Sequence, residues 1–392
     1  MIYVGIDVAK DKHDCVITNS DGEVLAKVFS FPNNLEGFNT LFQRISSVSN
    51  DFSTIKVGLE ATGHYSYNLL GFLLDKGLNV YVLNPLHTNL FRKSLTLRKT
   101  KTDKVDAHTI TTMLMSMPDL KPYSETTYHN EDLKSLTRYR FDKVQERAKL
   151  KTSVSRLVTI LFPELEELVS TLHGTAIYTL LNEFPSAEAV ANAHLTRLTN
   201  LLSTASHGHY GKEKAEQIRN AAKHSIGSRM PAKSLELKHT IKLIGELSAE
   251  IGEIEAEIQR MMDDLNYPIL TIPGISYAMG SMIVAEVGDF SRFESPDKLL
   301  AYAGMSPSTY QSGKLESTYA HMEKRGSKYL RYALYNAAKY VCMHDPTFNS
   351  YLAKKRAEGK AYNVALSHVV RKLVRVIYQL EKTQQVYICK AA

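Results

Sequence analysis

Four acidic residues of the chain stand where a strand ends or a helix begins. Asp7 closes an apolar run that starts at Ile2, and Glu60 closes a second apolar run. Asp103 and Asp106 lie three residues apart in the expected first turn of a helix, so their carboxylates share one helical face. If the two strands are neighbours, all four acids converge at one edge of a sheet. Such an all-oxygen cluster suits Mg²⁺, and two such ions support phosphodiester chemistry.

Each of these acids also has a structural interpretation that needs no metal. Asp103 suits the N-cap of a helix, with Thr102 as the alternative cap, and Asp7 suits an ordinary strand end. Asp11 and Asp14 are nearby acids that complicate the assignment, and we expect Asp11 to face solvent beside two lysines.

The elements that must position the acids alternate between strands and helices. We expect strands at 3–7, 14–18, 24–31, 55–60 and 79–83, helices at 35–46, 65–74 and 103–115, and a basic loop before the last helix. This order combines an antiparallel start with parallel crossover units. It is the order of ribonuclease-H-like folds, so residues 1–125 are predicted to form a mixed-sheet domain.

The middle of the chain is predicted to be a long helical arm, residues 126–266. Its apolar residues alternate at spacings of three and four over about four heptads, which is typical of a coiled-coil seam. The seam comprises Leu237, Thr240, Ile244, Leu247, Ile251, Ile254, Ile258, Met261 and Leu265. Its partner is either the earlier helix near Val144–Leu161 in the same chain or a second copy, and we expect self-association. A small helical insert is predicted at about 174–230.

Residues 267–392 are predicted to form a mainly helical C-terminal domain. Ile272-Pro273-Gly274-Ile275 before a helix resembles a helix-hairpin-helix turn, whose backbone amides hold a phosphate, although an ordinary turn into a buried helix fits equally well. A loop carrying Ser312 follows, and basic helices are expected from Ser327 and from Tyr362.

Composition points to a polyanionic partner in a reducing compartment. The formal charge is +7, and the three cysteines have neither metal-ligand spacing nor a disulfide framework. Neither a signal peptide nor a membrane span is expected, so the protein is predicted to be cytoplasmic. The basic residues gather in three segments: Arg92, Lys93, Arg98, Lys99, Lys101 and Lys104; Lys324, Arg325, Lys328 and Arg331; and Lys354, Lys355, Arg356, Lys360, Arg371, Lys372 and Arg375. Such segments suit nucleic-acid phosphates, the alternative being solvated helix faces.

Four strings, taken together, indicate the family. They are Gly5-Ile6-Asp7-Val8-Ala9-Lys10, Leu59-Glu60-Ala61-Thr62-Gly63, Lys101-Thr102-Asp103-Lys104-Val105-Asp106-Ala107, and Ser312-Gly313 ahead of Lys324-Arg325-Gly326. In this order and spacing the chain resembles a transposase of the insertion-sequence one-ten family, which includes the pilin-gene invertase and bridge-RNA-guided recombinases. The resemblance covers nearly the whole chain apart from the insert.

The resemblance implies a RuvC-like domain with an Asp-Glu-Asp-Asp metal site, a coiled-coil arm and a C-terminal domain with a nucleophilic serine. Carried over by position, the acids are Asp7, Glu60, Asp103 and Asp106, and the serine is Ser312. The implied cofactor is Mg²⁺, as two ions, with Mn²⁺ as a substitute. The implied partners are donor and target DNA, a structured bridge RNA and further copies of the chain, as dimers to tetramers. The implied location is the nucleoid of a bacterium or archaeon.

A serine hydroxyl needs a base or a metal to become a nucleophile, so the resemblance requires Ser312 to approach the four acids. We therefore expect a composite site, in which the C-terminal domain of the same or of another subunit places Ser312 by the metals. Gly313 would let the backbone approach DNA. The expected nucleic-acid contacts are Arg98, Lys99, Lys101, Lys104, Gly313, Lys324, Arg325, Lys328 and Arg331.

Other functions remain open from the sequence. A metal-dependent nuclease that resolves branched DNA by hydrolysis would use the acids and leave Ser312 idle, while Tyr310 and Tyr319 are rival nucleophiles. A nucleotide phosphotransferase shares a related core, but the turn after Asp7 lacks the glycine and hydroxyl residues that bind phosphate. A non-catalytic nucleic-acid scaffold is the third alternative.

Overall fold

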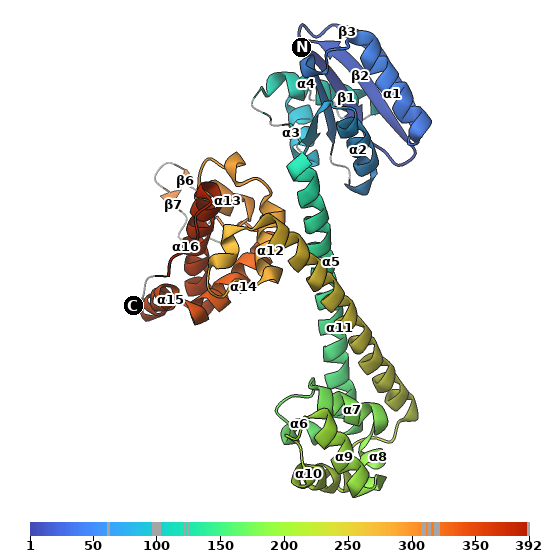
Figure 1. The fold of residues 1–392 in the computed structure, drawn as a ribbon, viewed down its shortest axis with the longest axis vertical. Helices are drawn as coiled ribbons and strands as arrows, with labels where there is room; N and C mark the ends of the chain where they lie inside the picture. Colours follow the sequence, from blue (N-terminus) through green and yellow to red (C-terminus); the bar gives the residue numbers. More distant parts are fainter. Residues whose placement is uncertain are drawn as a thin grey trace. The chain divides into compact units, whose positions relative to one another are not determined.

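The computed structural model describes residues 1–60, 63–95, 103–118, 120, 122–123, 125–306, 311–312, 315–316 and 322–389. Within these ranges the side chains of residues 63, 86, 95, 103–104, 125–130, 311–312 and 315–316 are not described. The chain divides into two compact units, Met1–His129 and Asn130–Ala392, which are treated separately below (Figure 1).

The first unit is built on a mixed five-stranded sheet with the strand order β3-β2-β1-β4-β5. Its strands are β1 (Ile2–Asp7), β2 (Lys12–Asn19), β3 (Val24–Pro32), β4 (Ile55–Glu60) and β5 (Asn79–Leu83). The first three strands are antiparallel, whereas β4 runs parallel to β1 and β5 runs parallel to β4. The expected mixed sheet, with an antiparallel start followed by parallel crossovers, is confirmed.

Helices cover both faces of this sheet. They are α1 (Leu35–Val48), α2 (Tyr67–Asp75), α3 (Pro85–Leu95) and α4 (Asp103–Ser116). Residues of α1 and α2 share one hydrophobic core with alternate residues of the strands, whereas residues of α3 and α4 pack with Tyr3, Tyr81 and Leu83 in a second core. The sheet therefore lies between two helical layers, because apolar residues alternate to both sides of its strands.

One element of this unit differs from the sequence prediction. The segment expected to be a basic loop contains α3, which begins at Pro85 and carries Arg92 and Lys93 in its last turn. Proline suits the first turn of a helix, where its missing N–H costs no hydrogen bond. The Asn84 carbonyl accepts from the amide and the hydroxyl of Thr88, which completes that turn.

The second unit contains two long antiparallel helices, α5 (Glu125–Leu161) and α11 (Pro231–Leu265). Side chains cross between them along their length. Arg140 donates to Glu255, and Arg156 donates to Glu236. Residues later in α5 thus pair with residues earlier in α11, so the two helices run in opposite directions. We call this pair the arm (Figure 1).

A small helical bundle, here called the tip, joins the two helices of the arm. Its helices are α6 (Leu165–Leu168), α7 (Thr175–Glu183), α8 (Ala187–Asn192), α9 (Leu195–Ala205) and α10 (Lys212–Lys223). Its hydrophobic core takes in Val154 to Leu161 from α5 and Leu237 to Ile244 from α11. The end of each arm helix is thereby fixed by the tip.

The remaining helices pack around a second, larger core. They are α12 (Tyr277–Val287), α13 (Pro296–Tyr302), α14 (Lys328–His344), α15 (Pro346–Ala357) and α16 (Tyr362–Thr383), with a short hairpin of β6 (Gln311–Ser312) and β7 (Leu315–Glu316). This core also includes Leu133 of α5 and Ile254, Ile258 and Met262 of α11. The arm is therefore anchored in two different cores, one at each end.

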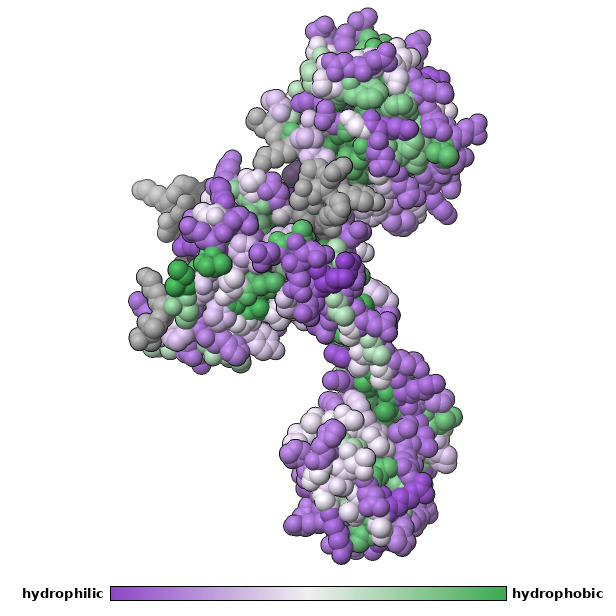
Figure 2. All heavy atoms as spheres, in the orientation of Figure 1, coloured by the Kyte–Doolittle hydropathy of each residue, from purple (hydrophilic) through white to green (hydrophobic). Residues whose placement is uncertain are grey.

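The seam predicted on α11 is used within the chain. Of its residues, Leu237, Thr240, Ile244, Ile251, Ile254 and Ile258 are buried, Leu247 and Met261 are half-buried, and Leu265 is 51% exposed. Ile241 and Met262, which lie outside the predicted seam, are buried as well. Figure 2 shows mostly hydrophilic side chains on the visible surface of each part of the chain. Self-association through the arm stays a prediction.

Among the described helices, none is both long enough and apolar enough to cross a membrane.

Candidate active site and nucleic-acid surface

Helix α4 lies directly against the sheet over a pair of glycines. Gly5 of β1 and Gly58 of β4 are register partners. A Cβ on Gly5 would lie 2.4 Å from the carbonyl oxygen of Ala107, and one on Gly58 would lie 2.6 Å from Cδ1 of Leu114. Only glycine at these two positions lets the helix approach the strands so closely.

This contact fixes the face on which the acids stand. Asp7 and Glu60 each follow one of the two glycines by two positions, and side chains two apart point to the same face of a strand. Since Ile6 is the register partner of Leu59, Asp7 and Glu60 end two adjacent parallel strands at the same edge. Asp106 lies next to Ala107, in the part of α4 that covers Gly5. Asp7, Glu60 and Asp106 thus share one face of the sheet.

Asp106 is held by a cation from the neighbouring helix. Nη1 of Arg92 in α3 lies 2.9 Å from Oδ1 of Asp106, and both side chains are largely buried. The other end of the guanidinium donates to Oδ1 of Asn89 at 3.0 Å. The carboxylate therefore has a positive partner at the point where the sequence predicts a metal ion. Oxygen donors alone fit Mg²⁺ or Mn²⁺, and the guanidinium would compete with such an ion for Asp106.

Asp103, the fourth predicted acid, begins α4, but its side chain lies outside the described residues. Among the side chains that are described, no group of three His, Cys, Asp or Glu residues lies close enough together to hold a metal ion. The four-acid metal site stays a prediction. Asp7, Glu60 and Asp106 are the described residues that would contribute to it.

Two buried polar residues of β2 lie near the end of β1, Asp14 on the face of the acids and His13 on the opposite face, against Phe38 of α1. Asp14 is the register partner of Asp7, so it lies on the same face, and the Ser30 hydroxyl donates to it at 2.5 Å. The amide of Ala9 donates to Nδ1 of His13 at 3.3 Å, which ties the turn after Asp7 to β2. Burial lowers the pKa of His13, so its imidazole is neutral near pH 7.

The buried position of His13 was not predicted from the sequence. His13 lies two and four residues before Cys15 and Ile17, which face the core of α1 and α2, so the alternation along the strand could have indicated that it faces the same core. Asp11, by contrast, is exposed, as expected.

The loop that carries Ser312 is closed at its base by backbone hydrogen bonds. The amide of Glu323 donates to the carbonyl of Ser306 at 3.2 Å, and the amide of Lys324 donates to that of Gly304 at 3.0 Å. Ser312 is in β6, paired with Leu315 of β7, and its side chain is not described. The described ranges exclude Arg98, Lys99, Lys101, Gly313, Tyr310 and Tyr319, and also the side chain of Lys104.

The base of the loop is packed against α13 through Gly326. This residue has φ +131°, and a Cβ on it would lie 2.1 Å from the carbonyl oxygen of Tyr302. The glycine of the predicted string Lys324-Arg325-Gly326 is therefore required by the backbone. Next to it, Ser327 caps α14 by accepting from the amide of Leu330 at 3.1 Å.

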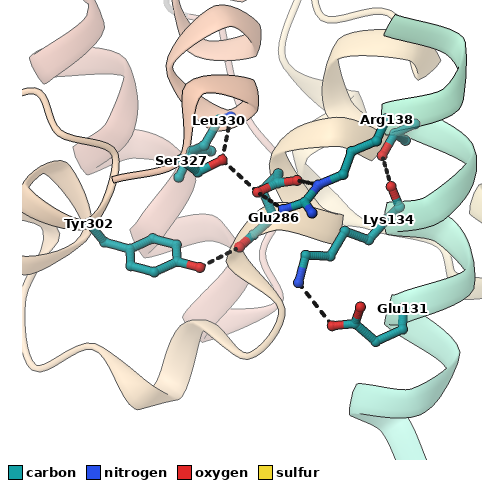
Figure 3. A network of polar contacts seen from close by, with 8 residues as sticks. Glu131, Lys134, Arg138, Glu286, Tyr302, Ser327 and Leu330 are labelled. Carbon is teal, nitrogen blue, oxygen red and sulfur yellow. Dashed lines mark hydrogen bonds and ion pairs between the residues drawn. The ribbon is translucent and has the colours of Figure 1, made fainter. Parts of the chain in front are cut away.

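A buried carboxylate joins this cap to the arm (Figure 3). Glu286 of α12, 2% exposed, accepts two hydrogen bonds from Arg138 of α5, at 2.6 and 3.0 Å. The hydroxyl of Ser327 also donates to Glu286, at 2.6 Å. A bidentate pair of this kind fixes both distance and angle. The start of α14 is thus tied to α5 and α12.

Parts of the second and third basic segments carry no carboxylate partner among the described residues, whereas Lys355, Lys360 and Arg375 of the third segment form ion pairs. Lys324 and Arg325 are exposed, and Lys328 and Arg331 follow on α14. On α16, Arg371, Lys372 and Arg375 line a groove of about 400 Å³ together with Tyr351 of α15. Within the described part of the chain, no carboxylate pairs with Arg371 or Lys372, which leaves their charges free for phosphates.

Two family models match the chain. A model described as a transposase matches residues 4–163, and the model of the transposase IS116/IS110/IS902 family matches residues 266–353. The first match covers the acid face, and the second covers the loop with Ser312 and the start of α14.

Two relatives match over nearly the whole length of the chain. The insertion element IS116 uncharacterized 44.8 kDa protein of Streptomyces clavuligerus is 25% identical and covers 98% of this chain and 96% of its own length. The pilin gene-inverting protein of Moraxella lacunata is 26% identical over 96% of this chain and 94% of its own. Among solved structures, Thermus thermophilus RuvC in complex with a Holliday junction substrate matches 31% of this chain and 99% of RuvC, with 16% identity and a TM-score of 0.23.

Proposed function

This chain belongs to the IS110/IS116 family of transposases, and from that membership we propose that it cuts and rejoins DNA by serine chemistry at a Mg²⁺-dependent site. The proposed site combines Asp7, Glu60, Asp103 and Asp106 with Ser312. The observation that carries the proposal is the shared face of Asp7, Glu60 and Asp106, found in a chain that has both transposase regions in the family's order.

The acids would hold Mg²⁺, which supplies charge stabilisation for the phosphoryl oxygens and lowers the pKa of a bound hydroxyl. Asp106 is paired with Arg92, so Mg²⁺ would compete with the guanidinium for this carboxylate. Four carboxylates on one face would repel one another without a positive charge. Two divalent ions would balance them.

Ser312 would act as the nucleophile. Its hydroxyl loses a proton to a carboxylate or water and attacks a backbone phosphorus, forming a phosphoserine ester. The bond from phosphorus to one deoxyribose oxygen breaks, and that oxygen takes up a proton. A deoxyribose hydroxyl of the second DNA then attacks the ester and releases the serine. The number of phosphodiester bonds is conserved, so rejoining needs no external energy source.

The site would be composite, since Ser312 lies in the unit Asn130–Ala392 and the acids lie in Met1–His129. The closed base of the serine loop supports this role, because a nucleophile has to be held close to its reacting geometry. We propose a ribonuclease-H/RuvC-like first unit, assembly as dimers to tetramers, and guidance by a bridge RNA. The last two follow from the family resemblance.

The partners would be donor and target DNA. The pilin gene-inverting relative is named for a DNA rearrangement, which supports a recombination reaction for this chain as well. Lys324, Arg325, Lys328 and Arg331 would contact phosphates near Ser312, and the groove of Arg371 and Arg375 would extend the positive surface.

Replacement of Ser312 by alanine tests the mechanism. The Ser312→Ala variant should lose strand exchange between DNAs that carry the element's own ends and insertion site, whereas Ser306→Ala, at the loop base, should retain it. The unaltered protein should also leave a covalent protein–DNA adduct on a denaturing gel that the Ser312→Ala variant lacks. Full strand exchange by Ser312→Ala would eliminate the serine mechanism. Hydrolytic nicking without exchange, in both proteins, would favour a metal-dependent nuclease.

A further inference from the structure

One face of α14 combines cations with aromatic rings. Lys328, Arg331, Tyr332 and Tyr335 follow at spacings of three, four and seven, so their side chains share a face of the helix. This face belongs to the element that Ser327 caps and Glu286 fixes. The combination matters because single-stranded nucleic acid is held by aromatic stacking of its bases and cationic contacts to its phosphates.

The same residues line a recess. It has a volume of about 460 Å³ and is lined by Met322, Lys324, Lys328, Arg331, Tyr332, Tyr335 and Asn363. Asn363 comes from the first turn of α16, where Ala361 provides no side-chain cap for the backbone amides. The lining therefore combines the amide side chain of Asn363 with the two tyrosines.

The rings and one of the cations are held in place. The ring of Phe141 packs edge-on against Tyr332 with a centroid distance of 4.8 Å. Nη1 of Arg331 donates to the carbonyl of Ala303 at 3.0 Å. Burial raises the pKa of Tyr335, against the opposing effect of Arg331, so the phenol stays neutral. The recess is preformed, which reduces the entropic cost of binding.

The structure pairs the cations of the recess with no carboxylate among the residues it describes. Within the described residues, no carboxylate forms an ion pair with Lys324, Lys328 or Arg331. Glu323 is the acidic neighbour in sequence, and it is exposed. Three cations beside two tyrosines fit an anionic, aromatic ligand.

We propose that this recess holds an unpaired nucleotide of a nucleic-acid strand, with its base stacked on Tyr335 and its phosphates held by Lys324 and Lys328. The inference rests on the proposed function and adds to it. The serine loop re-enters the unit at Met322 and Lys324, which line the recess. A nucleotide held there would be unstacked from its duplex, and the adjoining backbone phosphate would be kept near the loop.

The chain contains no tryptophan, which allows a direct test in the full-length protein. In Tyr335→Trp the new indole is the sole tryptophan, and a base stacked on it quenches its fluorescence. Short oligothymidylate should quench this signal to saturation, and a duplex of equal length should do so weakly. Tyr178→Trp, at a partly buried tyrosine of the tip, is the matched control and should respond to neither.

Two further variants separate stacking from folding. Tyr335→Leu should weaken oligothymidylate binding by about 5- to 100-fold, while Tyr335→Phe, which keeps the ring, should bind within about twofold of the unaltered protein. The double variant Lys324→Ala with Lys328→Ala should have a shallower slope of the logarithm of the binding constant against the logarithm of the salt concentration. The change should correspond to the loss of roughly two phosphate contacts. Oligouridylate is compared in parallel, and preferential quenching by it identifies the strand as RNA rather than DNA.

Equal quenching by duplex, or no quenching with Tyr335→Trp folded as judged by circular dichroism, overturns the proposal. These readouts require no strand exchange. If the recess binds oligothymidylate and the Ser312→Ala variant remains fully active, only the serine mechanism is contradicted. If quenching is absent and strand exchange still depends on Ser312, only the proposal for the recess is contradicted.

Discussion

At the scale of single residues, the acid face depends on two glycines as much as on the acids. Gly5 and Gly58 admit α4, and without that close approach Asp106 would not reach the face of Asp7 and Glu60. A larger side chain at either glycine would displace the helix. The metal hypothesis therefore includes a packing requirement.

The ion pair of Arg92 with Asp106 leads to a prediction about metal binding. In Arg92→Ala, Mg²⁺ should raise the melting temperature by more than in the unaltered protein, and the effect should begin at a lower Mg²⁺ concentration. The reason is that the guanidinium no longer competes for the carboxylate of Asp106. Differential scanning calorimetry with and without Mg²⁺ measures the effect.

The matched control for Arg92→Ala is Lys93→Ala, at the exposed neighbour on α3. The combination Asp7→Asn with Glu60→Gln should abolish the response to Mg²⁺, and the same pair of changes should abolish strand exchange. An identical Mg²⁺ response in all of these proteins would contradict the proposed metal site.

At the scale of elements, the Glu286 network is a polar link between the arm and the start of α14 (Figure 3). Glu286→Ala should lower the free energy of unfolding by about 3 kcal/mol, near the lower end for a broken buried pair because Arg138 is 41% exposed. Urea denaturation followed by circular dichroism measures this. Glu294→Ala, at an exposed acid nearby, should change it by less than about 0.5 kcal/mol. Equal effects of the two changes would show that the network contributes nothing.

Glu381 of α16 makes stability depend on pH. Burial raises its pKa from 4.5 to about 7, although the amide of Ile269 donates to it at 2.7 Å. Between these values the folded state binds more protons than the unfolded state, so stability falls as pH rises through the window. The loss amounts to roughly 3 kcal/mol at most, since each pKa unit corresponds to about 1.4 kcal/mol.

Glu381→Gln removes this ionisation and keeps an acceptor for Ile269. The variant should therefore be more stable than the unaltered protein at about pH 8, and the difference should shrink towards about pH 5. Urea denaturation at both values checks the sign. A variant less stable at the higher pH would contradict the assignment.

The strands could be predicted because each is marked by a local pattern in the sequence, apolar residues that in β1 and β4 end at an acid. α3 was missed although Leu86, Leu90 and Leu95 recur at near-helical spacing, because the basic residues favoured a loop and the helix start depends on Asn84 and Pro85. The sequence also indicated, from the strand ends, that Asp7 and Glu60 end neighbouring strands, and the convergence of all four acids stays a prediction. The ion pair with Arg92 and the pairing of Asp14 with Ser30 depend on tertiary contacts that no local pattern records.

At the scale of the whole molecule, the acids and Ser312 belong to different compact units. The Asp7→Asn variant retains Ser312 in an unaltered second unit, and the Ser312→Ala variant retains all four acids in an unaltered first unit. If copies of the chain contribute to one another's sites, mixing these two inactive variants should restore strand exchange. Exchange is measured with each variant alone and in equimolar mixture. Continued inactivity of the mixture would place both halves of the site in one chain.

The two cores at the ends of the arm have a consequence for how the protein is made. The tip core uses residues from Val154 to Ile244, a continuous stretch of chain. The other core needs Leu133 together with residues as late as Leu380. Synthesis from the N-terminus therefore completes the tip first, while Leu133 has to wait for the last helix. During that interval the first half of α5 exposes its apolar face, and the nascent chain is most open to chaperones and to aggregation.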